Sequence, residues 1–193
     1  MTEWIAKSAN PLETFNQWYE KAKENTSFEP TKMVLATTGL DGWPSARTVL
    51  LKEHGPEGFY FYTNYGSRKA KELEANPKAS LLFHWQHPEH RQVRIQGEVQ
   101  KLSYEQSQAY FATRNRGSQI GAWASPQSEE IQDREELVKR VQEIEEKFSG
   151  KPVPCPEFWG GFRLIPRSFE FWQAGDDRLH NRIKFFQDPE NGS

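Results

Sequence analysis

Cationic and hydroxyl-bearing side chains recur along this sequence in a pattern suited to phosphate binding. The cations and one serine of this set are Arg47, Lys52, Arg68, Lys69, Arg114, Ser118, Arg178 and Arg182. They are interleaved with amides, hydroxyls and aromatic rings at Tyr62, Thr63, Gln92, Tyr110, Gln127, Ser128 and Trp172. Arginine and lysine hold phosphate, while amides and hydroxyls fix ring heteroatoms. The set therefore suits a phosphorylated aromatic ligand, and its number of cations would allow two phosphates.

The strongest local signal lies at Ser67-Arg68-Lys69, between an apolar strand and a short helix. Ser67 is a suitable N-cap, so Arg68 and Lys69 would open the helix. Cations at a helix N-terminus are unfavourable against the helix dipole, whereas the backbone N–H groups there favour an anion. Two cations in this place predict a bound anion. The alternative is that they are ordinary solvated charges beside a hairpin.

Other kinds of chemistry are less well supported. His84, His87 and His90 have metal-like spacing, but they cross a strand end and a proline turn, where alternation points the rings in different directions. We therefore expect no metal site. Cys155 lies between two prolines with no evident base, and no Gly-x-Ser-x-Gly occurs. A net charge of -2 and the lack of a basic stripe argue against nucleic acid.

Length and composition set the general frame. The 193 residues predict a single domain, 1–193, with flexible ends at about 1–10 and 187–193. A single cysteine excludes an intramolecular disulfide and suits a reducing compartment. The sequence contains no long apolar run and no signal peptide, so we expect a soluble, cytoplasmic protein.

The elements that would position these residues are mostly strands. A helix begins after the Asn10 N-cap, and further helices begin near Arg68, after Ser103 and after Asp133. Apolar and aromatic runs predict strands over 33–37, 45–52, 59–63, 79–85, 92–101, 159–165, 168–172 and 183–186. We expect the run at 47–52 to pair with 59–63 around a turn at 55–58. We also expect a hairpin turned at Pro166-Arg167.

About seven strands with hairpin connections predict a mainly β fold with α additions, an antiparallel barrel or sandwich. A dinucleotide-binding α/β fold is excluded because there is no Gly-x-Gly-x-x-Gly and no alternation of strands and helices.

An ordered series of motifs from about Pro11 to Arg182 resembles the pyridoxine/pyridoxamine 5′-phosphate oxidase family. The motifs are Arg47-Thr-Val-Leu-Leu-Lys52, Phe61-Tyr-Thr-Asn64, Ser67-Arg-Lys69, Arg91-Gln-Val-Arg94, Ser118-Gln-Ile-Gly-Ala-Trp123, Gln127-Ser128, Trp159-Gly-Gly161, Phe169-Glu-Phe-Trp-Gln173, Arg178-Leu-His180 and Arg182. The sequence departs from the family at Asn181, where Asp is usual, and lacks the family's closing Trp and Arg-Leu-x-Pro. We expect these departures to affect activity more than fold.

The resemblance implies an antiparallel split β-barrel that binds FMN between the two subunits of a homodimer. It implies FMN contacts at Arg47, Lys52, Tyr62, Thr63, Arg68, Lys69, Gln92, Gln127, Ser128, Trp172 and Arg182. It also implies a substrate site at Lys52, Tyr110, Arg114, Ser118, Arg178 and His180, with Arg178 and His180 over the pyridine ring as the catalytic pair.

The activity implied by the resemblance is the oxidation of pyridoxine or pyridoxamine 5′-phosphate to pyridoxal 5′-phosphate. Dioxygen is the oxidant and hydrogen peroxide the product, and the flavin carries the redox chemistry. Two alternatives stay open. One is a flavin oxidase of the same fold that acts on another aromatic substrate, such as a phenazine-pathway intermediate. The other is a non-catalytic relative that binds FMN or pyridoxal phosphate.

Overall fold

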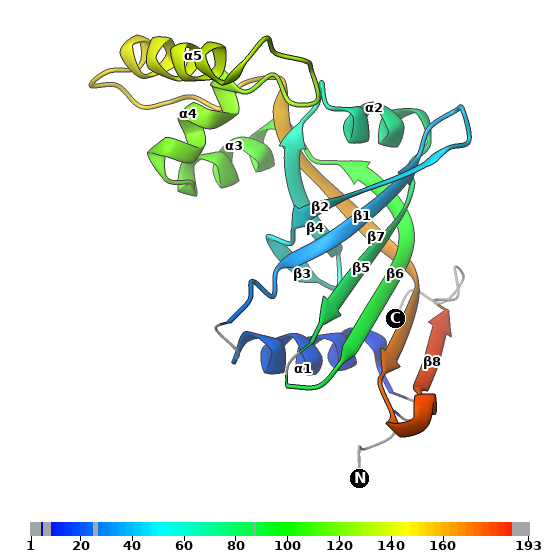
Figure 1. The fold of residues 1–193 in the computed structure, drawn as a ribbon. Coiled ribbons are helices and arrows are strands. Elements are labelled where there is room, and N and C mark those ends of the chain that lie inside the picture. Colours follow the sequence, from blue (N-terminus) through cyan, green and yellow to red (C-terminus); the bar gives the residue numbers. More distant parts are fainter. Residues whose placement is uncertain (1–4, 6–8, 25–26, 87, 187–193) are drawn as a thin grey trace.

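The computed structural model describes residues 5, 9–24, 27–86 and 88–186 (Figure 1). Most residues of the two predicted flexible ends lie outside these ranges, so those expectations stay predictions. The elements in chain order are α1 Pro11–Lys23, β1 Lys32–Thr38, β2 Pro44–Leu50, β3 Glu53–Gly55, β4 Gly58–Asn64, α2 Arg68–Ala75, β5 Lys78–Trp85, β6 Arg91–Lys101, α3 Tyr104–Thr113, α4 Arg116–Ala124, α5 Arg134–Lys147, β7 Trp159–Gln173, the 3-10 turn η1 Asp176–Arg178 and β8 Asn181–Phe186.

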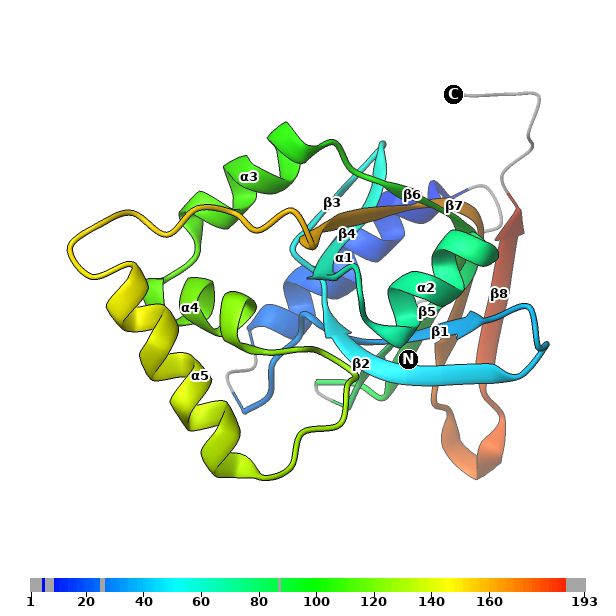
Figure 2. The same cartoon turned by 90° about the horizontal axis from the view of Figure 1, so that it is seen from above.

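The strands form one antiparallel sheet in the order β2-β1-β5-β6-β7-β4-β3, with β8 added on β7. Its strong twist curls the sheet into a half-barrel (Figure 1). The predicted antiparallel split-barrel class is confirmed. The helices lie at the ends of this barrel and beside it, as the view from above also shows (Figure 2).

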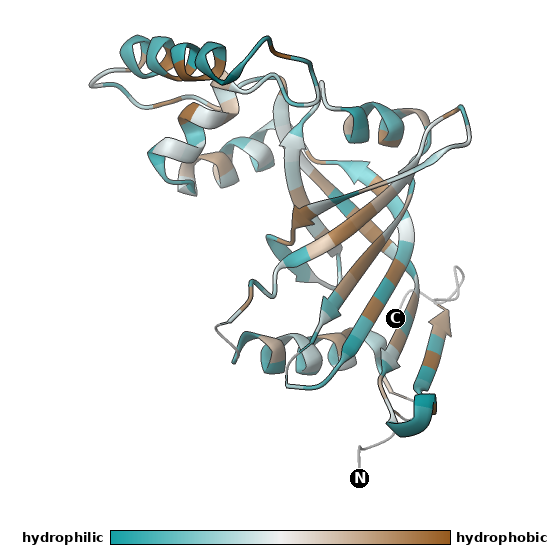
Figure 3. Cartoon of the chain, viewed as in Figure 1, coloured by the Kyte–Doolittle hydropathy of each residue, from teal (hydrophilic) through white to brown (hydrophobic). Residues whose placement is uncertain are grey.

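The barrel core follows from alternation along each strand. In β6, Val93, Ile95, Gly97 and Val99 are buried and the residues between them face outward, which is visible as alternating bands in Figure 3. Helix α1 closes one end of the barrel. The Asn10 side chain caps this helix as predicted, and Phe15 contacts Phe59 and Phe83 edge to face.

The predicted pairing of 47–52 with 59–63 is wrong. Strand β2 pairs with β1 through the Asp41-Gly42 turn, and β4 pairs with the short β3 and with β7. Because the β1 edge already takes β2, the chain leaves the β1–β2 ladder at Leu51 and Lys52 and starts a new hairpin. A single backbone bond, from Lys52 N–H to the Tyr60 carbonyl, crosses this split.

The predicted hairpin at Pro166-Arg167 is also wrong, because β7 runs through both residues as one strand. Gly97 pairs with Pro166 and Gln96 with Ser168, so Arg167 is left out of the pairing as a bulge. A proline has no N–H to donate, and strands tolerate it at such a bulge. The Pro-Arg signal therefore marks a bulge and not a turn.

Helices α3, α4 and α5 form a second, smaller core outside the barrel, built from Phe111, Ile120, Phe148, Val153, Cys155 and Trp159. The sequence predicted α3 with its capping box and α5 with its Asp133 cap. Helix α4, which begins after Asn115, was not predicted. In the described part of the chain, no helix is both long and apolar enough to cross a membrane.

We predict that Gly97→Ala destabilises the protein, because a Cβ at Gly97 would lie 1.9 Å from the Ile165 carbonyl oxygen. The expected loss is about 1–3 kcal/mol of unfolding free energy, as for other overpacked sites. Urea denaturation measures it. Gly121→Ala is the control: a Cβ there meets no atom within 4 Å, and alanine in a helix gains up to about 1 kcal/mol. Equal midpoints for the two variants would contradict the close approach of β6 and β7.

Candidate functional site

The start of α2 brings Arg47, Arg68 and Lys69 together, and the two arginines share one carboxylate, that of Glu72. Glu72 Oε2 accepts hydrogen bonds from Thr37 Oγ1 at 2.5 Å, Ser45 Oγ at 2.6 Å and an Arg47 terminal nitrogen at 3.0 Å, and Oε1 accepts one from Arg68 Nε at 2.7 Å. Burial opposes ionisation of this carboxylate, but the four hydrogen bonds outweigh it and lower the pKa of Glu72 to about 2. Glu72 is therefore ionised at neutral pH and joins β1, β2 and α2. The sequence interpretation had given it no role.

Lys69 is the third cation, and it is buried. Its Nζ donates to Thr63 Oγ1 at 3.0 Å, Ser67 Oγ at 3.3 Å and Gln127 Oε1 at 2.9 Å. Burial first, and then the charge of Arg47, lowers the pKa of Lys69 to about 8. All three acceptors are neutral groups, so none of them offsets the charge. A bound anion would.

Ser67 occupies the predicted N-cap position, but its side chain makes no cap hydrogen bond. It accepts from Lys69 instead. The Ser67 carbonyl accepts from the Ala70 and Lys71 N–H groups, so the N–H groups of Arg68 and Lys69 are those that receive no acceptor from Ser67. These two N–H groups add to the attraction that the Arg68 and Lys69 side chains exert on an anion.

A cavity of about 570 Å³ adjoins this cluster. Eight of the predicted site residues line it, namely Lys52, Tyr62, Thr63, Lys69, Tyr110, Arg114, Ser118 and Gln127. Six other residues also line it and have no site role in the sequence analysis, namely Thr48, Val49, Leu50, Thr113, Asn115 and Trp159. Of these six, Trp159 could have been found from the sequence, because it is the first residue of the Trp159-Gly-Gly161 motif.

Stacked aromatic rings form one wall of the cavity. Tyr62 stacks on Tyr110 with ring centroids 3.9 Å apart and on Trp159 at 5.4 Å. Burial raises the pKa of Tyr62 to about 12, so its hydroxyl stays protonated at neutral pH. The wall offers a flat apolar surface with hydroxyl groups at its edge, which suits an aromatic ligand.

Arg114 supplies a second positive centre in the same cavity. Its guanidinium lies 4.7 Å from the centre of the Trp159 ring, and one of its terminal nitrogens is buried without a hydrogen-bond partner in the described structure. Burial lowers the pKa of Arg114 from its usual value. A buried donor of this kind is costly unless a ligand satisfies it. Arg114 therefore marks a position for a second anionic group, separate from the α2 cluster.

The remaining predicted residues form a second group on β6, β7 and β8. Gln92 pairs with Trp172, and Trp172 pairs with Arg182. His180 contacts the Trp172 ring at 4.7 Å, and the Gly175 N–H donates to His180 Nδ1 at 3.3 Å. Because Nδ1 accepts this bond, the neutral His180 ring carries its proton on Nε2 and presents a donor.

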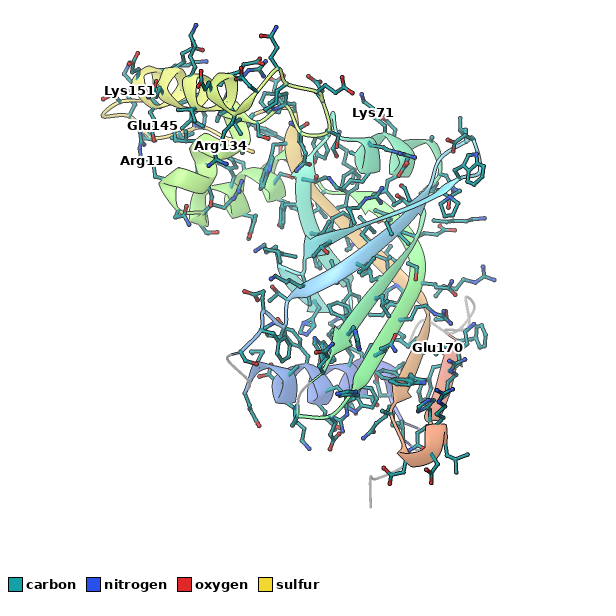
Figure 4. The ribbon with its side chains drawn as sticks, viewed as in Figure 1. Lys71, Arg116, Arg134, Glu145, Lys151 and Glu170 are labelled. Atoms are coloured by element: carbon teal, nitrogen blue, oxygen red, sulfur yellow. The ribbon has the colours of Figure 1, made fainter. Side chains whose placement is uncertain are left out.

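This second group does not line the cavity. It lies at the end of the barrel away from α3 and α4, where Glu170 is labelled in Figure 4. Glu170 pairs with Arg94 at 2.7 Å and lies 3.9 Å from Arg182. The turn that carries Arg178 has two successive non-glycine residues with positive φ, Asp177 at 52° and Arg178 at 64°. Such strain is concentrated at functional sites.

Three more predicted residues border the cavity without lining it. Arg47 and Arg68 belong to the Glu72 cluster, and Ser128 follows Gln127 with a left-handed φ of 70°. One chain thus holds two separate groups of predicted site residues. Across the described ranges, no set of three or more His, Cys, Asp or Glu side chains could hold a metal ion. His87 lies outside those ranges.

Two family models match this chain. The model described as pyridoxamine 5′-phosphate oxidase matches residues 20–148, and the model of the pyridoxine 5′-phosphate oxidase C-terminal dimerisation region matches residues 159–192. The chain belongs to the pyridoxamine 5′-phosphate oxidase family. The dimerisation region of this oxidase family contains Trp172, Arg178, His180 and Arg182, four residues of the second group.

Relatives within this family are similar over most of their length. The pyridoxine/pyridoxamine 5′-phosphate oxidase of Rubrobacter xylanophilus is 54% identical over 91% of this chain and 81% of its own. The pyridoxine/pyridoxamine 5′-phosphate oxidase of Psychromonas ingrahamii is 54% identical over 95% of this chain and 84% of its own.

Among solved structures, PhzG from Burkholderia lata 383, in complex with tetrahydrophenazine-1-carboxylic acid, has a TM-score of 0.88 and 30% identity over 96% of this chain and 90% of its own. A pyridoxamine 5′-phosphate oxidase-related, FMN binding protein from Nostoc punctiforme has a TM-score of 0.67 and 15% identity over 94% of this chain and 100% of its own. This second likeness shows the fold alone.

We predict that the Lys69 ammonium titrates near pH 8 in the free protein and that saturating phosphate raises this midpoint. Because the pKa of Lys69 is lower in the folded protein than its usual value of 10.5, the charged lysine lowers the free energy of unfolding at neutral pH. This loss of stability disappears as pH rises from about 8 to 10.5. NMR of carbon-labelled lysine measures the titration, and Lys69→Met assigns the signal. A midpoint near 10.5, unaffected by phosphate, would contradict the burial of this cation.

Proposed function

We propose that the protein is an FMN-dependent oxidase that converts pyridoxine or pyridoxamine 5′-phosphate to pyridoxal 5′-phosphate. One observation carries the proposal: a single cavity with a stacked aromatic wall joins two separate positive centres, the α2 cluster and Arg114. The cofactor and the substrate each bring one phosphate group to one flat ring system. Two cationic centres and an aromatic wall match that pair of ligands.

The residues present fit FMN at the α2 cluster. Lys69 lacks an anionic partner among its three hydrogen bonds, and the Ser67 side chain makes no cap hydrogen bond to the first N–H groups of α2. Arg47, Arg68 and Lys69 would hold the cofactor phosphate, while Lys52, Tyr62, Thr63, Gln127 and Ser128 would contact the rest of the cofactor. When bound, FMN would supply the redox chemistry: it would be the acceptor for the hydride that leaves the substrate C4′ carbon and the electron donor to dioxygen, which would become hydrogen peroxide.

The substrate phosphate would be held by Lys52, Tyr110, Arg114 and Ser118. The buried, unpartnered nitrogen of Arg114 gains a charged acceptor, and the ring of the substrate lies along the aromatic wall. Arg178 and His180 would orient the pyridine ring, with His180 donating from Nε2 because its Nδ1 is occupied. The amine substrate needs a water molecule in addition to dioxygen, and releases ammonia.

A homodimer completes the site. The cavity and the second group lie apart within one chain, and four of the five residues of the second group fall in the family's dimerisation region. We propose that Gln92, Trp172, Arg178, His180 and Arg182 of one subunit close the cavity of the other. The buried and unpaired Cys155 is compatible with a reducing, cytoplasmic location.

A second candidate is oxidation of another aromatic substrate, since PhzG shares the fold at a TM-score of 0.88. The buried donor of Arg114 suits either a phosphate or a carboxylate, so it does not separate the two candidates. The relatives that are 54% identical favour the phosphorylated pyridine.

We predict that purified protein carries a flavin absorption band that bleaches on anaerobic addition of pyridoxine 5′-phosphate and returns with air. Visible spectroscopy measures this directly. An unchanged band would leave a flavoprotein with another substrate or without turnover. A colourless protein that cannot be reconstituted with FMN would overturn the proposal.

We predict that Arg178→Ala lowers kcat by about tenfold or more without releasing the flavin, because it misplaces the substrate ring and not the cofactor. Steady-state kinetics and the flavin content of the purified variant measure the two effects. Arg167→Ala, an exposed arginine at the bulge of β7, is the control and should leave both values unchanged. Loss of the flavin together with activity would contradict the role given to Arg178.

A further inference from the structure

We infer that Glu72 is the positioning residue of the phosphate site: its carboxylate fixes Arg47 and Arg68 so that both terminal nitrogens of Arg68 stay free for the ligand. The inference rests on the proposed function in taking FMN as that ligand. Glu72 lies in α2 and joins it to Thr37 of β1 and to Ser45 and Arg47 of β2. It therefore connects three elements at the place where the anion would sit.

Arg47 has almost no donors left for a ligand. One terminal nitrogen donates to the Leu35 carbonyl at 3.2 Å and to Thr37 Oγ1 at 2.5 Å. The other donates to Ser45 Oγ and to Glu72. A guanidinium has four terminal N–H bonds, and all four are used here, so that only Nε–H remains. Arg47 can therefore reach the phosphate through Nε–H, and it also adds charge and rigidity to the site.

Arg68 has the opposite arrangement. Its Nε donates to Glu72, and this is the hydrogen bond that the described structure gives for this side chain. The side chain is 61% exposed, and its two terminal nitrogens make no hydrogen bond in the described structure. They can form a bidentate pair with phosphate oxygens. Glu72 thus holds the inner edge of the guanidinium and leaves its outer edge to the ligand.

Charge balance supports the same role. Arg47, Arg68 and Lys69 bring three positive charges together, and Glu72 brings one negative charge. The difference, 3 − 1 = 2, is about the charge of a phosphate monoester at neutral pH. Without Glu72, repulsion between the two arginines and the buried lysine would oppose the arrangement in the free protein.

The experiment compares Glu72→Gln with wild type in the binding of FMN and of riboflavin, which lacks the phosphate. Flavin fluorescence on titration with apoprotein gives both dissociation constants. A glutamine that keeps its oxygen toward Thr37, Ser45 and Arg47 turns its NH₂ toward Arg68 Nε–H, so Arg68 is released. We expect FMN affinity to fall about tenfold or more, and riboflavin affinity to change less than about twofold.

Glu74→Gln is the matched control, since Glu74 is an exposed carboxylate on the same helix. Lys71, also on α2, likewise points to solvent (Figure 4). The control should bind both flavins as wild type does. An equal loss for both flavins in Glu72→Gln would indicate a merely structural role and overturn the inference, as would no loss for either.

Arg68→Gln keeps the inference testable if Glu72→Gln fails to fold, because Arg68 is largely exposed. It should show the same selective loss for FMN, and the double variant should lose no more than either single variant. Unchanged FMN affinity in Arg68→Gln would overturn the inference.

Inorganic phosphate separates this inference from the proposed function. It should raise the melting temperature of wild type more than that of Glu72→Gln or Arg68→Gln. A wild-type protein that binds neither flavin would overturn the FMN proposal, and the phosphate comparison would then decide the role of Glu72 alone. If phosphate raised the melting temperature of all three proteins equally, the role inferred for Glu72 would be wrong.

Discussion

The ion pairs of Glu72 with Arg47 and Arg68 are the contacts on which the candidate site depends most. Cations repel one another, and burial next to an apolar barrel raises the cost of each charge. The Glu72 carboxylate, which accepts four hydrogen bonds, offsets part of that cost and fixes both arginines before a ligand binds. The start of α2 therefore carries a net positive charge that the described side chains do not neutralise. Binding an anion there satisfies groups that folding has left unpaired.

The split in the sheet explains where the site lies. Strand β2 stays with β1, while the chain turns at Leu51 and Lys52 into the β3–β4 hairpin. Residues of β2 and β4 both line the cavity, together with Tyr110 and Arg114 from the α3–α4 region. The long strand β7 links the two groups of residues, since Trp159 lies at its first residue and Trp172 near its last. One strand thus carries parts of both groups.

Local sequence signals predicted much of this. Capping residues gave the starts of α1, α3 and α5, and alternation gave the buried face of β6. Pro166 misled because its local preference for a turn is overridden by its ladder partner, Gly97, which admits a bulge. Helix α4 was missed because its Gly and Ser residues weaken the helical pattern.

Glu72 resembles a surface carboxylate in the sequence, and only packing against β1 and β2 reveals its partners. The bond from Lys69 to Gln127 joins residues 58 apart, which no local pattern encodes.

We propose that two groups of residues, separate in one chain, meet between two subunits. Mixed dimers of Arg114→Ala and Arg178→Ala subunits test this most directly, since each variant alone is expected to lose about nine-tenths or more of its activity. If the groups meet across the interface, every mixed dimer has one intact site, and subunit exchange restores about a quarter of wild-type activity. Mixing Arg114→Ala with Lys69→Met, which alter the same group, should restore none. No recovery in the first mixture, with dimer exchange verified, would contradict the account.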